Sequence, residues 1–317
     1  MGTFILRRLI QSLLLAFSVS VLVFVALQLA PGDPATMLVD PAYFTPQQFA
    51  ELRASLGLED PWPVQYVKTM GGMFTGTLRS FRSQEPTLKM VMDSLPTTFK
   101  IMAGGVLIAV LIGIPLGMVA ATRPGSFFDN LLSLGMAVGL SVPSFVLALV
   151  LVRVFAEQLR WLPASGIRPA GASSYSWTTA LSHMVLPCIV TALPNIPILA
   201  RYTRDALREV LQEDYVRTAA AKGLSRSVVM WRHMLPNVLV PLLSVLGIII
   251  PLLLGGSAII ETLFALPGIG RVAVQAALLR DYPVVMTTTI VSTLLIVVSN
   301  LITDMLYFIV DPRLRPR

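Results

Sequence analysis

The sequence predicts an all-α integral membrane protein with six transmembrane helices, and three observations support this fold class. Apolar residues make up 55% of the 317-residue chain and charged residues only 13%, whereas soluble domains carry about 25% charged residues. The mean hydropathy is +0.76. The apolar residues also gather in long, nearly uncharged runs, and about 20 such residues are enough for a helix to cross a bilayer.

The first span is predicted over residues 9–30, within an N-terminal part that covers residues 1–30. Arg7 and Arg8 precede the run, and the run is longer than the apolar core of a cleaved signal peptide, which holds about 7–15 residues. Pro31 follows directly, and we expect it to disfavour cleavage. This part is therefore expected to remain as a membrane helix.

Residues 31–98 are predicted to form an extracytoplasmic helical segment. Thr45 followed by Pro46 has the pattern of an N-cap and a first-turn proline. Three apolar residues then fall on one helical face, and Gly57 ends the run. These apolar residues are Phe49, Leu52 and Leu56.

A second short helix is expected over residues 63–70, where Gly71 and Gly72 would stop it. Two roles stay open for the whole extracytoplasmic segment, and they are compatible. It is either a lid that packs on the outer ends of the spans or a docking surface for an external partner.

Five further spans complete a core domain over residues 99–317. Four of them are clear apolar runs, at residues 101–121, 130–152, 238–260 and 284–303. The remaining run, 184–200, is shorter and contains Pro187, Pro194 and Pro197. Because neighbouring helices can satisfy the backbone groups that proline frees, we interpret it as a kinked helix, with a re-entrant segment as the alternative.

Both termini are expected to be cytoplasmic. With that orientation the inner segments hold 13 of the 24 basic residues, so the basic count barely discriminates between the two orientations. Loop length decides more, because long loops cross a membrane regardless of their charge. The net charge of +7 is explained by this topology, and we do not expect nucleic-acid binding.

The polar insert at residues 201–236 is the strongest candidate for a functional site. Small helix-forming residues lead to Gly223, where glycine allows a tight turn, and Ser225 can cap a second helix. Connections between bundle helices usually hold about 2–8 residues, so this insert is more than a connector. A smooth corner of this kind can sit in a groove on another protein and transmit a rigid-body movement.

The helix expected before this corner is dense in charge. Arg201 and Asp205 form a favourable pair four residues apart, whereas Arg204 with Arg208 and Asp205 with Glu209 are like-charged. This pattern indicates a helix whose charges have partners elsewhere.

The insert resembles the cytoplasmic "EAA" loop of permease subunits of binding-protein-dependent ABC importers. That loop reads Glu-Ala-Ala, three residues, Gly, nine residues, Ile, one residue, Leu-Pro. Gly223 and the pair Leu235-Pro236 fall at the expected positions. Arg217 stands in place of the glutamate and His233 in place of the isoleucine, which departs from the general pattern.

The local sequence at residues 215–224 instead resembles the dipeptide/oligopeptide branch of that family. Further strings match the same branch and extend the resemblance over nearly the whole chain. They are Pro31-Gly32-Asp33-Pro34, Leu162-Pro163-Ala164-Ser165-Gly166, residues 261–271 and Asp281-Tyr282-Pro283.

The resemblance implies a type I ABC importer permease fold in the bacterial cytoplasmic (inner) membrane, surrounded by lipids. An extracytoplasmic binding protein would deliver the cargo to a path formed with a second, homologous permease subunit. Two cytoplasmic ABC ATPase subunits would bind ATP and Mg and receive the coupling corners in grooves. The chain has no G-x-x-x-x-G-K-[ST] phosphate loop, so the nucleotide is expected on the partners and no cofactor on this chain.

Two groups of site residues are expected, and the first follows from the resemblance. The ATPase-coupling group has Ala219, Ala220 and Gly223 as its contact corner and Lys222 as a cation that can pair with the ATPase. Its members are Arg217, Thr218, Ala219, Ala220, Ala221, Lys222, Gly223, Leu224 and Ser225. A second group is expected at the outer mouth or in contact with the binding protein, with a surface salt-bridge cluster as the alternative. Its members are Asp33, Glu261, Arg271 and Asp281.

The sequence leaves a second function open, a stand-alone ion-coupled secondary transporter that uses Asp304, an acid in the last apolar stretch. The near absence of charge in the spans and of a convincing internal repeat disfavours it. An intramembrane enzyme is a third class, but Ser182, His183 and Cys188 make no credible catalytic group. The two histidines, His183 and His233, suggest no metal site. The cargo stays open between dipeptides, oligopeptides, glutathione and a nickel chelate.

Overall fold

The structure is a computed structural model that describes residues 2–39, 43–167 and 177–310. In these residues it is helical, apart from loops and one isolated bridge between Arg79 and Pro86. The chain forms two compact units. The first unit comprises Phe99–Leu266 and the residues from Val298, and the second comprises Gly2–Thr98 and Pro267–Val297. The three-part division expected from the sequence stays a prediction.

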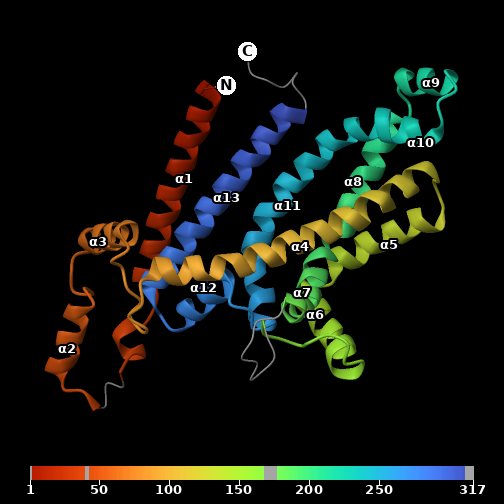
Figure 1. Ribbon diagram of the computed structural model, residues 1–317. Coiled ribbons are helices and arrows are strands. Elements are labelled where there is room, and N and C mark those ends of the chain that lie inside the picture. The colour runs from red at the N-terminus through yellow and green to blue at the C-terminus, as the bar shows by residue number, and fades with distance from the viewer. Residues whose placement is uncertain (1, 40–42, 168–176, 311–317) are drawn as a thin grey trace. The chain divides into compact units, whose positions relative to one another are not determined.

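Four helices of the described chain are long and apolar enough to cross a membrane (Figure 1). They are α1 (Gly2–Leu29), α4 (Thr87–Thr122), α11 (Leu235–Leu263) and α13 (Tyr282–Val310). They coincide with the first, second, fifth and sixth predicted spans.

The fourth predicted span is broken in two, as its prolines suggested. Helix α7 (Trp177–Ala192) and helix α8 (Asn195–Val210) are bent by 50° at the break between them. Pro194 lies in this break, where it supplies no N–H to the preceding turn. If the bent pair counts as one span, the described chain has up to five.

The third predicted span, residues 130–152, is not one continuous helix. Helix α5 (Phe127–Ser141) ends before Pro143, and the short helix α6 (Ser144–Leu151) begins after it. Proline cannot donate the helical hydrogen bond and restricts the residue before it, here Val142. A π-helical segment, η3 (Val152–Gln158), follows α6. A crossing here, and hence the count of six spans, stays a prediction.

The second unit contains the two short helices expected after the first span, α2 (Pro46–Ser55) and α3 (Trp62–Thr75). It also contains the 3-10 turn η1 (Pro34–Met37) and, from the later part of the chain, α12 (Ile269–Leu278). Phe24 of α1 packs in a hydrophobic cluster with Met73 of α3 and with Met286 and Ile290 of α13.

Local capping rules explain where α2 begins and ends. Thr45 and Gln48 form a reciprocal capping box, which confirms the predicted N-cap, and Gly57 follows the helix with φ of +70°. The predicted stop of α3 at Gly71-Gly72 was wrong. Helix α3 continues through both glycines and ends at Gly76, which has φ of +73°, because an interior glycine costs a helix only about 1 kcal/mol.

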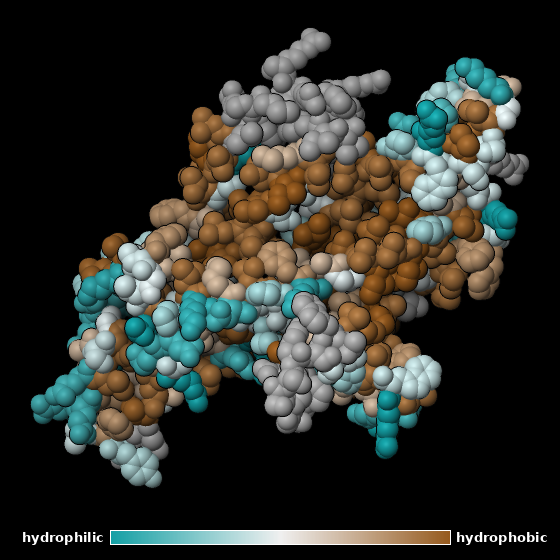
Figure 2. Space-filling view, in the orientation of Figure 1, coloured by the Kyte–Doolittle hydropathy of each residue, from teal (hydrophilic) through white to brown (hydrophobic). Residues whose placement is uncertain are grey.

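In the first unit, α8 lies beside α5 and α11 (Figure 1). Leu199 and Leu207 of α8 share a buried hydrophobic cluster with Val238, Leu242 and Val245 of α11. Figure 2 shows mostly hydrophobic side chains over the visible parts of α4 and α5. Hydrophilic side chains gather instead on the polar insert that joins α8 to α11, so this insert is distinct from the apolar helices on either side of it.

Candidate functional site

The polar insert folds into two short helices that meet at a turn. A three-residue turn after α8 leads into α9 (Asp214–Ala221), and α10 (Arg226–Val228) follows the corner. A second π-helical segment, η4 (Val229–Met234), then joins α10 to α11. Figure 1 shows α9 projecting beyond the ends of α8 and α10. This arrangement agrees with the predicted pair of helices at a sharp bend, and we call residues 217–225 the corner.

Gly223 makes the turn of the corner, as predicted. Its φ is +76°, a backbone conformation that other residues adopt only with strain, and a Cβ built on it would meet no atom within 4 Å. The glycine is therefore required by the backbone and not by lack of space. Two bonds close the turn, from Gly223 N to Ala220 O at 3.0 Å and from Leu224 N to Ala219 O at 3.4 Å.

The next helix begins with a cap, as expected. The hydroxyl of Ser225 accepts a hydrogen bond from the backbone N–H of Val228 at 3.4 Å. This satisfies one of the donors that the first turn of a helix leaves without a partner.

The corner presents one face to solvent and buries the other. Val216 and Ala219 are buried and share a hydrophobic cluster with Val229 and Met234. The other eight residues of the corner are exposed. Ala219 is only 6% exposed, so its expected place in the contact surface was wrong: it attaches α9 to the next helix instead. Ala220, Lys222 and Gly223 remain available to a partner.

A second attachment joins α9 to the start of α11. The amide Nδ2 of Asn237 donates to the hydroxyl oxygen of Tyr215 at 3.0 Å and to the carbonyl of His233 at 2.8 Å. Partial burial, with the nearby charge of Glu213, raises the pKa of Tyr215, so the phenol is neutral at physiological pH. The corner is thus fixed to α11 by both packing and a hydrogen bond.

The charges of α8 find their partner in the first turn of α5, at Asp129. Asp129 Oδ1 accepts from Arg204 Nη1 at 2.8 Å, and Asp129 Oδ2 accepts from Arg208 Nη2 at 3.0 Å. Arg208 also donates to the carbonyl of Ala120 at 3.3 Å. We call Asp129, Arg204 and Arg208 the charged anchor. The sequence had indicated partners for α8 without identifying Asp129.

Asp129 is held in its charged form. The backbone N–H of Gly125 donates to Oδ2 at 3.0 Å. This bond and the hydrogen bond from Arg204 lower the pKa of Asp129 from 3.8 to about 2. The side chains of Asp129 and Arg204 are only 15% and 16% exposed, so solvent screens this pair less than an open surface pair. The predicted pair Arg201–Asp205 also forms, at 3.6 Å, but it is more exposed.

Two of the sequence strings singled out above meet in the first unit. Gly166 N donates to the carbonyl of Phe264 at 2.8 Å. The ring Nδ1 of His183 lies 3.1 Å and 3.0 Å from the carbonyl oxygens of Ser165 and Gly166, so it donates a shared bond to them. His183 therefore holds a loop in place, and this accounts for a buried histidine without a catalytic role.

Most of the four residues expected at an outer mouth are buried in the chain or bonded to other residues of it. Glu261 is fully buried and Asp281 is 6% exposed, and Asp281 accepts from the Ser80 hydroxyl and from Phe81 N. Asp33 accepts from Ala35 N at 2.9 Å and forms an ion pair with Arg53. Arg271 of α12 is half-buried. Of the four, Glu261 and Asp281 are thus not exposed for contact with a partner.

Comparison with known proteins shows that two protein families match this chain. Residues 1–102 match the family described as "Binding-prot-dependent transport system membrane comp, N-term". Residues 113–316 match the family described as "Binding-protein-dependent transport system inner membrane component".

Relatives match along the full length. The chain is 37% identical, over 99% of both proteins, to the oligopeptide transport system permease protein AppB of Bacillus subtilis (strain 168). It is 39% identical to the probable peptide ABC transporter permease protein y4tP of Sinorhizobium fredii (strain NBRC 101917 / NGR234), over 99% of this chain and 100% of that protein. It is also 36% identical, over 98% of both, to a putative peptide permease protein of Brucella suis biovar 1 (strain 1330).

A solved structure shares the fold. A chain of the MetNI methionine ABC transporter, in inward-facing conformations, aligns with a TM-score of 0.55 and 18% identity, over 72% of this chain and 99% of that chain. A second crystal form gives a TM-score of 0.54 at 19% identity. At this identity the likeness concerns the fold alone.

Proposed function

Because the chain belongs to the family of inner membrane components of binding-protein-dependent transport systems, we propose that it is a permease subunit of an ATP-driven peptide importer. Peptide cargo is supported by the relatives at 36–39% identity, which are named as oligopeptide or peptide permeases. The comparisons give no support to an ion-coupled transporter that uses Asp304.

The corner is the observation that carries this function. It exposes Arg217, Lys222 and Gly223 on a turn whose inner side is packed against the chain. A surface of this shape can be received in a groove of a partner ATPase subunit, and ATP hydrolysis belongs to that partner. The corner then lies in the cytoplasm, and the two termini lie on the same side.

The corner is connected closely to the membrane helices α8 and α11, so a movement of the corner can be transmitted to them. Helix α9 follows α8 after three residues and is bonded to the start of α11 through Tyr215 and Asn237. Helices α8 and α11 share one buried cluster. Since a packed pair of helices moves as a unit more readily than it deforms, a tilt of the corner would tilt α8 and α11 together. The path they line with a second permease subunit would then open to alternate sides.

The assembly is tested by affinity purification of the chain from native membranes, followed by mass spectrometry. We expect a second permease, ABC ATPase subunits and an extracytoplasmic binding protein to be recovered with it. Recovery of the chain alone, together with transport in liposomes driven by an ion gradient, would overturn the proposal.

The role of the corner is tested by Gly223→Leu in the reconstituted transporter. Gly76→Leu is the matched control, because Gly76 has φ of +73° and also has no atom within 4 Å of a built Cβ. Both variants carry similar backbone strain, but only Gly223→Leu places a bulky side chain on the corner. We expect Gly223→Leu to abolish ATP-driven transport and to lower recovery of the ATPase subunits, with the fold retained. Normal transport by Gly223→Leu would contradict the proposed role.

A further inference from the structure

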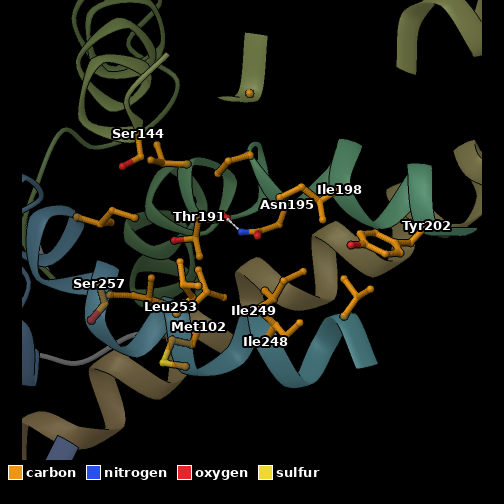
Figure 3. Close-up of a pocket in the computed structure, with 17 residues that line it drawn as sticks. Met102, Ser144, Thr191, Asn195, Ile198, Tyr202, Ile248, Ile249, Leu253 and Ser257 are labelled. Carbon is orange, nitrogen blue, oxygen red and sulfur yellow. Dashed lines mark hydrogen bonds between the residues drawn. The ribbon is translucent and has the colours of Figure 1, made fainter. Parts of the chain in front are cut away.

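A cavity of about 330 Å³ lies inside the first unit. Its walls come from α4, α5, α6, α7, α8 and α11, and Figure 3 shows labelled side chains of α7 and α8 facing those of α11 across it. Asn195 and Thr191 stand on one side, and Ile249 and Leu253 on the other. Ligand pockets in proteins span about 300–1,000 Å³, so the cavity is large enough for a small ligand or for part of a longer one.

The chemistry of the wall is uncharged. Among the described residues that line the cavity, none is acidic or basic and none is a histidine or cysteine. Most are aliphatic, and the polar ones carry hydroxyl or amide groups. These polar residues are Ser144, Thr191, Asn195, Tyr202 and Ser257. Such a wall offers no ligand that would hold a metal ion and no charge to pair with an ionised group. It suits a ligand whose polar groups are neutral donors and acceptors.

The break between α7 and α8 borders this cavity. Pro194 and Asn195 both belong to the lining, and the two helices are bent by 50° there. In a membrane, non-helical backbone is tolerated only where it is buried in protein or lines a cavity. Discontinuous helices also mark the substrate sites of many transporters. The break and the cavity are thus two features that are both typical of a substrate site in a transporter.

Asn195 is placed to bond a ligand at this break. Its Nδ2 donates to the carbonyl of Thr191 at 2.8 Å (Figure 3), which fixes the orientation of the amide. No donor among the described residues reaches its Oδ1. The hydroxyl of Thr191 donates to the carbonyl of Pro187 at 2.8 Å and keeps its capacity to accept. The site thus presents two oriented acceptors in an otherwise apolar wall.

We infer that this cavity is the part of the path where the chain contacts the backbone of a passing peptide, with Asn195 and Thr191 as the hydrogen-bonding residues. Neutral amide N–H groups of the peptide bond these two oxygens, while its side chains lie along the aliphatic wall. The uncharged wall favours a peptide over a metal chelate. The inference rests on the proposed function and names the substrate-contacting residues for it.

Two matched variants test the two polar residues. Thr191→Val removes a hydroxyl that lines the cavity, and Thr203→Val removes one that does not. Both hydroxyls are buried, at 3% and 0% exposure, and both donate to the carbonyl four residues earlier, Thr203 to Leu199 at 2.7 Å. Asn195→Leu removes the amide with little change in volume. The variants are compared in the complete transporter, reconstituted in liposomes with ATP inside and peptide-loaded binding protein outside.

We expect Asn195→Leu to lower trialanine uptake about tenfold and Thr191→Val to lower it severalfold, as the loss of a ligand hydrogen bond predicts. Thr203→Val should keep wild-type uptake. ATP hydrolysis stimulated by the loaded binding protein should stay within about twofold in all three. A trialanine probe with a photoreactive diazirine should label residues 191–202 or 245–260 of the wild-type chain.

Three outcomes would overturn the inference. Wild-type uptake by both Asn195→Leu and Thr191→Val would mean that the cavity holds lipid or stays empty and does not contact the peptide. Loss of the second permease from purified Asn195→Leu complexes would mean that the partner subunit covers it. Labelling confined to other parts of the chain would place the path elsewhere. Failure of the proposed function is distinct, because the wild-type complex would then show no ATP-driven uptake.

Discussion

At the corner, Gly223 has φ of +76° and a Cβ built on it would meet nothing within 4 Å, whereas a Cβ on Gly117 of α4 would lie 2.3 Å from the carbonyl oxygen of Ala200. The first glycine provides a backbone angle and leaves the surface free. The second lets α4 approach α8 closely. One residue type thus sets a backbone angle at the surface in one region and allows close packing in the other, and substitutions at the two positions should have different effects on function and on folding.

The largest effect is expected on the packing side of this comparison. Gly117→Ala places a methyl group against the carbonyl of Ala200 and 2.6 Å from Cβ of Thr203, and overpacking of this kind costs about 1–3 kcal/mol. We expect a clear loss of thermal stability, measured by unfolding of the purified protein in detergent. The control is Gly135→Ala in α5, where the nearest atom, Cβ of Pro197, lies 3.6 Å away. If both variants unfold like the wild type, close packing does not explain Gly117.

The charged anchor should give the next largest effect. Asp129→Asn removes the acceptor charge shared by Arg204 and Arg208, so we expect a lower melting temperature and weaker coupling of ATP hydrolysis to uptake. Asp205→Asn is a matched control, since Asp205 also pairs with Arg204, at 3.0 Å, but is 51% exposed. Exposed pairs contribute only about 0–1 kcal/mol. Equal effects of the two substitutions would show that burial of the anchor has no consequence.

The anchor also predicts a pH dependence with a definite sign. The pKa of Asp129 is lowered from 3.8 to about 2 in the folded chain, so its contribution to stability is complete above the unfolded value and is lost as the pH falls through the folded one. The difference in melting temperature between wild type and Asp129→Asn should be constant from about pH 8 to 5 and shrink between about pH 4 and 2. A difference that changes near neutral pH would point to another titrating group.

The smallest effect is expected at the cap of the corner. Ser225→Ala removes the acceptor for Val228 N, and loss of a cap costs about 0.5–2 kcal/mol. The bond is long, at 3.4 Å, so we expect faster amide exchange at residues 226–229 and an unchanged melting temperature. Ser227→Ala, at an exposed position of the same helix, should leave exchange unaltered. Global destabilisation by Ser225→Ala would mean that the corner is part of the folding core.

The sequence predicted those features that depend on a few neighbouring residues. The Thr45 cap and the Gly223 turn obey rules that operate within three or four positions, and the structure confirms both. The sequence did not predict whether a given proline ends a helix or is accommodated within it. Pro187 lies inside α7 without ending it, whereas Pro143 separates α5 from α6. The outcome depends on packing, which a single sequence does not display.

The candidate site was predictable to the same extent. Its exposed turn follows from local composition, but the burial of Ala219 depends on Val229 and Met234 in the next segments. The anchor pairs Asp129 with Arg204, 75 positions later. The like-charged spacing of Arg204 and Arg208 indicated that a partner exists, while only the tertiary fold identifies it. Asn195 was likewise missed, because its position at a cavity is a property of six helices together.

The π-helical segment η4, between the corner and α11, fixes the direction in which the corner faces. Each residue of an α-helix advances the chain by about 100° around the axis, and a π-turn accommodates one residue more than an α-turn. If Val229–Met234 were α-helical at the same length, the extra residue would instead rotate α9 and the corner by about 100° around the axis of α11. The π-turns thus act as an angular setting, because they absorb one residue of chain length and keep the direction in which the corner faces.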